Sequence, residues 1–172
     1  MGNLCRSPTA HAVFRHRVGQ AGLDSSVRID SAGTHASPHG ERPDSRAQVC
    51  ARQRGYVLSG LRSRPVIASD FTTFDLLLAM DDDNLAHLRR RAPPQELHRL
   101  RRLTDFCLHN HASQGVPDPY YGNVQGFEQV LNLIEDACDG LLAHVRQQLR
   151  AAPQGTDKNI QIDSFQRNTH QR

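Results

Sequence analysis

The sequence predicts an α/β fold in which a parallel sheet lies between layers of helices. Residues 74–80 form a continuous apolar run, which is typical of a parallel strand covered on both faces. Residues 124–150 carry apolar side chains at spacings of three and four, which predicts a long amphipathic helix packed on a large surface. Segments of these two kinds alternate along the chain, and that order favours a parallel sheet with helices on its faces.

The first predicted helix runs from Pro8 to about Ala21. Ser7 is a favourable N-cap, and Pro8 fits the first helical position, where its missing N–H is harmless. Gly22 is a suitable residue to end the helix. The apolar residues that share one face at helical spacing are Ala10, Val13, Phe14, Val18 and Ala21.

Three more elements are predicted before residue 100. Residues 27–31 alternate apolar and polar side chains and indicate a strand. Asp44 is expected to cap a second helix that ends at Gly55. A further helix is expected at 82–91, ended by the proline pair at 93–94.

The last third of the chain predicts one more strand, a loop and a tail. Residues 103–108 are interpreted as a strand because the apolar run is short, and residues 109–119 as a loop. Residues 153–172 are polar and show no sustained period, so we expect a disordered tail. The predicted organisation is a single domain at 1–150 followed by a tail at 151–172.

The composition of the chain argues against several broad classes of protein. The 172 residues carry a net charge of +3, too little for a general nucleic-acid field, and the six arginines within 89–102 are interpreted as a solvated surface. We find no secretory signal and no apolar run long enough to span a membrane. The four cysteines have no Cys-x-x-Cys spacing, which favours reduced thiols in a cytoplasm over a disulfide framework.

The first eight residues, MGNLCRSP, predict a phosphate-binding loop. Gly2 and Asn3 tolerate unusual backbone angles, and the planar fork of Arg6 suits a phosphate group. The helix that follows directs its N-terminal amides and dipole at the loop. Covalent phosphoryl transfer also needs a thiolate, and in the spacing Cys-x5-Arg that cysteine would immediately precede Met1. The candidate substrate-binding residues of the loop are Gly2, Asn3, Leu4, Cys5, Arg6 and Ser7.

Asp118 is the candidate proton donor. It lies between Pro117 and Pro119, which stiffen the loop and can hold a carboxyl at hydrogen-bond distance from a leaving oxygen. Taken alone, an aspartate in such a loop more often starts a turn. Tyr120 and Tyr121 are candidate substrate-binding residues that could form the wall of an aromatic pocket.

Several blocks in this order resemble the low-molecular-weight protein tyrosine phosphatases. The blocks are GNLCRSPTA at 2–10, DSAGT at 30–34, DFTTFDLLLAMDDDNL at 70–85 and PDPYYG at 117–122, followed by the long helix. The resemblance covers roughly residues 1–150.

The resemblance implies a three-layer sandwich with a central parallel four-stranded sheet flanked by helices. The family's first strand leads into the phosphate loop and lies between the strands predicted at 27–31 and 74–80; it is absent from this chain. Each buried backbone group left unpaired costs on the order of 1–3 kcal/mol. We therefore expect the chain to fold poorly and interpret Met1 as an internal residue of a longer protein.

The resemblance also implies hydrolysis of phosphotyrosine or aryl phosphate monoesters through a cysteinyl-phosphate. Arg6 and Asp118 would be catalytic, Asn3 would hold the loop in shape, and Ser7 would lower the pKa of the thiolate. Substrates would be a phosphotyrosine protein or a small aryl phosphate. No metal or other cofactor, no nucleic acid and no membrane is expected, and the protein would be a cytoplasmic monomer. The chain as written would be inactive.

Two other functions stay open. One is a non-catalytic module that binds phosphate or a phosphorylated protein, because the nucleophile is missing. The other is thiol-dependent arsenate reduction, which is disfavoured because the relatives that catalyse it carry further cysteines near 80–92 and this chain has none there.

The remaining candidate groups are given mainly structural roles. Cys5 lacks the loop spacing of a nucleophile and is either a small buried residue or, by the resemblance, a redox partner of the missing cysteine. Asp81 is a weaker acid candidate that would cap the next helix. His109 and His111 have no further ligands nearby and are interpreted as solvated.

Residues 30–55 contain no Phe, Tyr or Trp. The family often has a large aromatic residue in the loop after Thr34, where this chain has Ser37. A strong preference for aryl substrates would therefore rest on Tyr120 and Tyr121.

Overall fold

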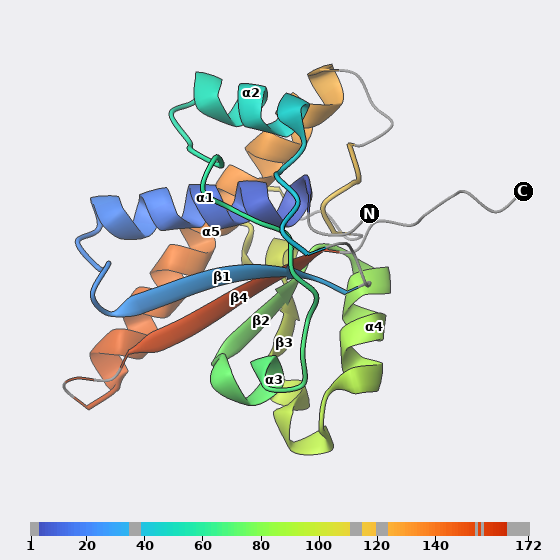
Figure 1. Cartoon of the computed structure of the whole chain (residues 1–172). Helices are drawn as coiled ribbons and strands as arrows, with labels where there is room; N and C mark the ends of the chain where they lie inside the picture. Colours follow the sequence, from blue (N-terminus) through green and yellow to red (C-terminus); the bar gives the residue numbers. More distant parts are fainter. Residues whose placement is uncertain are drawn as a thin grey trace, which may run out of the picture.

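The computed structural model consists of a parallel sheet between two layers of helices (Figure 1). It describes residues 4–34, 39–110, 115–119, 124–153, 155 and 157–164. The helices are α1 (Arg6–Gln20), α2 (Ser45–Gln53), α3 (Asp70–Thr73), α4 (Asp82–Arg91) and α5 (Val124–Ala151), with 3-10 turns η1 (Pro94–Arg99) and η2 (Leu103–Phe106). The strands are β1 (Val27–Gly33), β2 (Leu76–Ala79), β3 (Leu100–Arg102) and β4 (Lys158–Ser164).

The four strands have the order β1-β4-β2-β3, and every pair is parallel. Helices α1, α2 and α5 cover one face of the sheet, and α3 and α4 cover the other (Figure 1). The predicted fold class, a central parallel four-stranded sheet flanked by helices, is therefore confirmed.

The interior strand is supplied by the carboxyl-terminal segment. We expected disorder at 153–172, and this is wrong for β4, which lies between β1 and β2 where the sequence predicts a missing strand. Lys158 N–H donates to Ser26 O (2.8 Å), and Asp75 N–H donates to Asn159 O (2.9 Å). The open backbone groups of β1 and β2 favour pairing with a nearby extended segment. Ile160, fully buried, gives this segment its contact with the core.

Two apolar cores stabilise the sandwich. The larger one lies between the sheet and α1, α2 and α5, and the smaller one between the sheet and α3 and α4. The predicted apolar face of the first helix is confirmed except at Ala21, which is only half-buried. The fully buried large side chains are Phe14, Phe71, Leu77, Leu78, Met80, Leu88, Leu103, Leu131, Ile134, Leu141 and Ile160.

Local sequence signals placed two helices correctly. The Asp44 carboxylate accepts from Arg46 N–H (2.8 Å) and caps α2, as predicted. Helix α4 has the predicted bounds, and Gly55 follows α2 with φ +85°. These termini depend on residues within one turn of the helix end, and such residues are visible in the sequence.

Two predicted boundaries are wrong. Helix α1 begins at Arg6, and its N-cap is Cys5, not Ser7, so Ser7 lies inside the first turn, where it is buried. Residues 103–108 do not form the predicted strand. The strand in this region, β3, ends at Arg102, and the 3-10 turn η2 follows it. The Asp105 carboxylate accepts from Arg102 N–H (3.1 Å), and this local bond favours a turn over extension of the strand.

Within the described part of the chain, no helix is both long and apolar enough to cross a membrane.

A buried histidine joins α1 to β1. His11 is 7% exposed, and its Nδ1 lies 3.2 Å from Ser31 Oγ. The pKa of His11 is lowered to about 4, mainly by burial. The positive charge of Arg15 contributes to this lowering, and it outweighs the opposite effect of the negative charge of Asp30. The folded protein therefore keeps this imidazole neutral over a pH range in which the unfolded chain, with a histidine pKa of about 6.5, takes up a proton.

The free energy of unfolding is expected to fall as the pH drops from about 6.5 to 4. The contribution of His11 to the free energy of unfolding is fully present above pH 6.5, and the loss of this contribution reaches about 3 kcal/mol near pH 4. Urea denaturation at pH 7.5 and 4.5 measures it. His11→Gln removes the titrating group, so its pH dependence over this range should be flatter than that of the parent protein. Equal pH dependence in the two proteins would contradict the assignment.

Candidate active site

The carboxyl ends of the parallel strands place three separate segments side by side. They are the start of α1, the residues after β2, and the segment 115–119. In open α/β sheets, ligand sites form at this edge. The fold therefore brings together the described parts of the two motifs that the sequence singled out, residues 4–10 and 117–119.

Arg6 connects these segments. Its side chain is 2% exposed, and Nη1 donates to Asp81 Oδ2 (2.6 Å) and to Val116 O (2.7 Å). The guanidinium thus faces a carboxylate at the carboxyl edge of the sheet. Arg6 is the predicted phosphate ligand, and here its partner is a carboxylate of the protein, which also carries negative charge.

Asp81 has two structural partners. Its Oδ2 accepts from Arg6, and its Oδ1 accepts from Asn84 N–H (2.8 Å), so it is the N-cap of α4. The interpretation of Asp81 as a helix cap is confirmed. Because both oxygens accept hydrogen bonds, this carboxylate is poorly suited to donate a proton to a leaving group.

A buried amide fixes the turn after β1. Asn84 and Thr34 are both buried, and Asn84 Nδ2 donates to Thr34 Oγ1 (3.2 Å). This bond joins the end of β1 to α4. The start of the chain is held as well, because Asp44 N–H donates to Leu4 O (2.8 Å).

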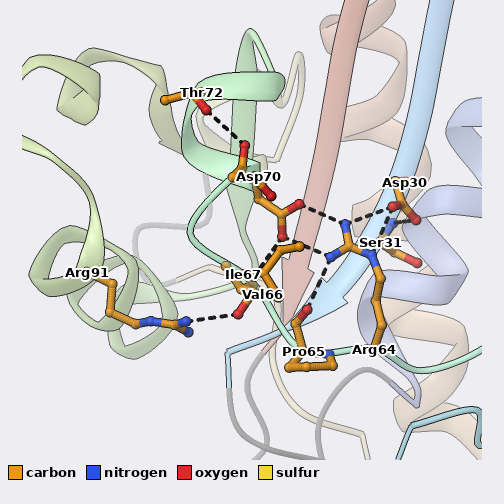
Figure 2. A network of polar contacts seen from close by, with 10 residues as sticks. Asp30, Ser31, Arg64, Pro65, Val66, Ile67, Asp70, Thr72 and Arg91 are labelled. Carbon is orange, nitrogen blue, oxygen red and sulfur yellow. Dashed lines mark hydrogen bonds and ion pairs between the residues drawn. The ribbon is translucent and has the colours of Figure 1, made fainter.

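An arginine network supports the segment that runs beside the end of β1 (Figure 2). Arg64 donates through Nε and Nη2 to Asp30 Oδ2 (2.9 and 2.8 Å) and through Nη1 to Asp70 Oδ2 (2.8 Å). The adjoining backbone pairs with Gly33 on both sides: Gly33 N–H donates to Arg64 O, and Val66 N–H donates to Gly33 O. The network therefore fixes the carboxyl end of β1 against α3.

The acid candidate Asp118 lies on an exposed stretch with one buried anchor. Pro117 and Asp118 are exposed, whereas Pro119 is buried and lines a small apolar cavity with Cys5 and Phe127. Val116 N–H donates to Met80 O (2.7 Å). The carboxyl of Asp118 is thus accessible to a substrate while the chain on either side of it is held.

Gly115 permits the close approach of this segment to β2. Its φ is +92°, and a Cβ added there would lie 2.4 Å from Met80 O and 2.6 Å from Asp81 Cα. Both atoms belong to the backbone and cannot move aside. The need for glycine at this position is not visible in the sequence, since it arises from a contact between distant segments.

Gly115→Ala is expected to destabilise the protein by about 1–3 kcal/mol, because it combines a disfavoured backbone angle with a backbone clash. Chemical denaturation measures the change. Gly60→Ala is the matched control, since a Cβ at Gly60 meets nothing within 4 Å and its φ is not positive. If both variants show the same stability, the segment 115–119 is not held as described.

Asp136 of α5 anchors residues 108–110, at the start of the loop predicted at 109–119. Its carboxylate accepts from the backbone N–H groups of Leu108, His109 and Asn110 at 2.8–3.2 Å and from His109 Nδ1 at 2.9 Å. Burial alone would raise the pKa of Asp136, but these hydrogen bonds outweigh it and lower the pKa to about 2. One turn later, Gly140 allows contact with Phe106 O, which a Cβ would approach to 1.8 Å.

His109 does not belong to a group of metal ligands in the part of the chain that the structure describes. His109 is 82% exposed, in agreement with the interpretation as a solvated histidine, but it also pairs with Asp136. No cluster of three or more His, Cys, Asp or Glu side chains suited to a metal occurs among the described residues. His111 lies outside them.

The four cysteines are buried free thiols. Burial raises the pKa of Cys50, raises that of Cys107 to about 11, and raises that of Cys138 still further. These three thiols are therefore protonated near neutral pH and unsuited to nucleophilic attack. Cys5 is 2% exposed at the N-cap of α1. Cys50, Cys107 and Cys138 are part of the larger apolar core.

Several predicted site residues lie outside the described part of the chain. They are Gly2, Asn3, Tyr120 and Tyr121, and Ser37 in the loop after Thr34. Of the predicted site, the structure thus places Leu4, Cys5, Arg6, Ser7 and Asp118.

Comparison with known proteins shows extended similarity. The sequence profile of the family "Low molecular weight phosphotyrosine protein phosphatase" matches residues 1–151. The low molecular weight protein-tyrosine-phosphatase of Streptomyces coelicolor is 43% identical over 153 residues, covering 86% of this chain and 91% of that protein. A putative low molecular weight protein-tyrosine-phosphatase of Synechocystis is 40% identical over 150 residues, covering 87% of this chain and 94% of that protein.

The fold is similar to solved structures as well. The crystal structure of a protein tyrosine phosphatase from Entamoeba histolytica with Hepes in the active site has a TM-score of 0.82 at 39% identity, over 86% of this chain and 94% of that chain.

Proposed function

Because the chain belongs to the low molecular weight phosphotyrosine protein phosphatase family, we propose that its site hydrolyses phosphotyrosine or aryl phosphate monoesters. One observation carries the proposal: Arg6 Nη1 donates to Val116 O at 2.7 Å, which joins the phosphate-loop arginine to the loop that bears Asp118. The proposal takes Arg6 as the anion ligand and Asp118 as the proton donor, both at the same edge of the sheet.

In the proposed reaction a cysteine thiolate attacks phosphorus, an S–P bond forms and the P–O bond to the phenol breaks. Asp118 donates its proton to the leaving oxygen. A water molecule, deprotonated by Asp118, then hydrolyses the cysteinyl-phosphate and releases inorganic phosphate. The phosphoryl oxygens would replace the Asp81 carboxylate as partners of Arg6, with the N-terminal amides of α1 beside them.

The thiolate for this reaction is not among the four cysteines of the chain, which are buried. The proposed reaction takes this thiolate from a cysteine at the Cys-x5-Arg spacing from Arg6, a spacing that none of the four cysteines has. The proposed reaction uses no metal or other cofactor. Tyr120 and Tyr121 would line the pocket for the aromatic ring of the substrate. We further propose a cytoplasmic monomer that acts on phosphotyrosine proteins or small aryl phosphates.

The test is to add a five-residue apolar strand before Met1, ending in cysteine or, as the matched control, in serine. The cysteine form should release p-nitrophenol from p-nitrophenyl phosphate, whereas the serine form and the 172-residue chain should not. Turnover by the 172-residue chain within tenfold of the cysteine form would make Cys5 the nucleophile and contradict the proposal.

A second function follows from the same observation. With every thiol buried, the 172-residue chain would bind phosphate or a phosphorylated protein through Arg6 without hydrolysing it. Saturable binding of inorganic phosphate by the 172-residue chain, combined with an inactive cysteine form, would favour this binding function over catalysis.

A further inference from the structure

A cleft lies beside the loop that carries Asp118. It has a volume of about 660 Å³ and lies between α5 and the segments 109–110 and 115–117. Ligand sites commonly have volumes of about 300–1,000 Å³. Pro117 lines the cleft and directly precedes Asp118 in the chain. A molecule bound in the cleft would therefore be next to the proposed proton donor.

Both sides of the cleft are fixed by the protein. On one side, the Asp136 carboxylate accepts from the backbone N–H groups of His109 and Asn110 (3.1 and 2.8 Å). On the other side, Val116 N–H donates to Met80 O (2.7 Å). The cleft is thus formed before a ligand binds, so little conformational entropy is lost on binding.

The helical wall of the cleft is polar. Gln129, Asn132 and Asp136 follow one another at spacings of three and four, and they therefore share one face of α5. Asp136 Oδ1 accepts from His109 Nδ1 (2.9 Å), and this bond fixes the direction of the exposed imidazole that lines the cleft. The other ring nitrogen, Nε2, is the atom that can bond a ligand.

Three carboxamides line the cleft, those of Asn110, Gln129 and Asn132. All three residues are exposed, and within the described part of the chain their side chains form no hydrogen bond with the protein. Each carboxamide offers an NH2 donor and a carbonyl acceptor. Among the described lining residues, His109 is the only titratable one. The cleft is therefore suited to an uncharged ligand that presents donors and acceptors in pairs.

A polypeptide main chain has this chemistry, because every residue other than proline presents one N–H and one C=O. Phenyl phosphate has no such groups. From this match, and resting on the proposed phosphatase function, we propose that the cleft binds the main chain next to the phosphotyrosine of a substrate polypeptide. Gln129 and Asn132 bond its peptide groups while the phosphotyrosine lies at Arg6 and Asp118. The substrate class is then phosphotyrosine polypeptides rather than small aryl phosphates.

NMR of the 172-residue chain tests binding without turnover. The main probe is a heptapeptide with phosphotyrosine at its centre and alanine at every other position. It should shift the side-chain NH2 signals of Asn110, Gln129 and Asn132, whereas phenyl phosphate should leave them in place. The same peptide with N-methylated alanines should shift them far less, because it lacks the peptide N–H groups. The signals of Gln147 and Gln148, exposed on α5 outside the cleft lining, are the control and should not move.

Kinetics of the cysteine form measure the contribution of the cleft to substrate choice. The double variant Gln129→Ala/Asn132→Ala should lower kcat/KM for the heptapeptide by about tenfold or more, mainly through KM, because it removes binding that does not change along the reaction. For p-nitrophenyl phosphate, kcat/KM should change by no more than about twofold. The matched control Gln147→Ala/Gln148→Ala should behave as the parent with both substrates.

Three results would overturn the proposal. One is the absence of shifts at the cleft carboxamides with the heptapeptide, and another is equal shifts with phenyl phosphate. The third is an equal loss of kcat/KM for both substrates in Gln129→Ala/Asn132→Ala, which would show support of the Asp118 loop rather than peptide binding.

The two proposals fail separately. Shifts at the cleft with no turnover of p-nitrophenyl phosphate by the cysteine form would contradict the phosphatase function and leave peptide binding by the cleft in place. Turnover of p-nitrophenyl phosphate without shifts at the cleft would leave the phosphatase function in place and remove the cleft from substrate binding.

Discussion

Replacing Asp118 with asparagine in the chain extended by the strand and cysteine is expected to lower kcat for aryl phosphates by about 10²–10⁴. Asp118 is exposed, whereas the segment around it is held by Val116 N–H on Met80 O and by buried Pro119. Asparagine keeps the shape of the side chain but cannot give up a proton to the leaving phenolate. The loss should therefore fall on the chemical step and leave the affinity for vanadate close to that of the parent.

The dependence on leaving group identifies the role of Asp118. Phenols of low pKa leave without protonation, so the loss in kcat/KM, which reports the step that releases the phenol, should shrink for p-nitrophenyl phosphate and grow for phenyl phosphate. Asp157→Asn, at another exposed aspartate, is the matched control and should leave kcat unchanged. An equal loss for both leaving groups would indicate a displaced loop rather than a missing proton donor.

Arg6→Lys in the same extended chain is expected to lower kcat by about 10²-fold or more and to weaken vanadate binding, although the charge is kept. The planar fork of arginine can bond two phosphoryl oxygens at once, and lysine cannot. Because the lysine side chain is shorter than that of arginine, it would also lose the bonds that Arg6 Nη1 donates to Asp81 and to Val116 O. Leaving such a buried carbonyl unpaired costs about 1–3 kcal/mol, so a moderate fall in stability is expected too.

Arg15→Lys provides the control for Arg6→Lys. Arg15 is exposed on the same helix and donates to the carbonyl of Val57. This variant should leave kcat and the vanadate inhibition constant unchanged. If Arg6→Lys is equally neutral in both measurements, Arg6 is not part of an anion site and the proposed phosphatase chemistry has no phosphate ligand.

Helix termini and buried strands could be predicted from the sequence because their causes are local. Asp44 and Asp81 cap α2 and α4 by accepting from backbone N–H groups two or three residues ahead. The apolar run that becomes β2 indicates burial on both faces by its composition alone. These features need no knowledge of distant segments.

Features that depend on distant segments could not be predicted. The strand β4 forms because β1 and β2 leave a position open between them, and its own polar composition indicated disorder. Gly115 is required because its backbone approaches Met80, and Asp136 collects three N–H groups from 108–110. The pairing of Arg6 with Asp81 likewise joins residues 75 positions apart.

The most direct test of the proposed mechanism is mass spectrometry of the cysteine-extended chain after an acid quench during turnover of p-nitrophenyl phosphate. The proposed reaction predicts one phosphoryl group on the added cysteine, in larger amount in Asp118→Asn, where hydrolysis of the intermediate lacks its base. The serine control should carry none. A phosphoryl group on Cys5, or turnover with no phosphoryl group on any cysteine, would contradict the cysteinyl-phosphate mechanism.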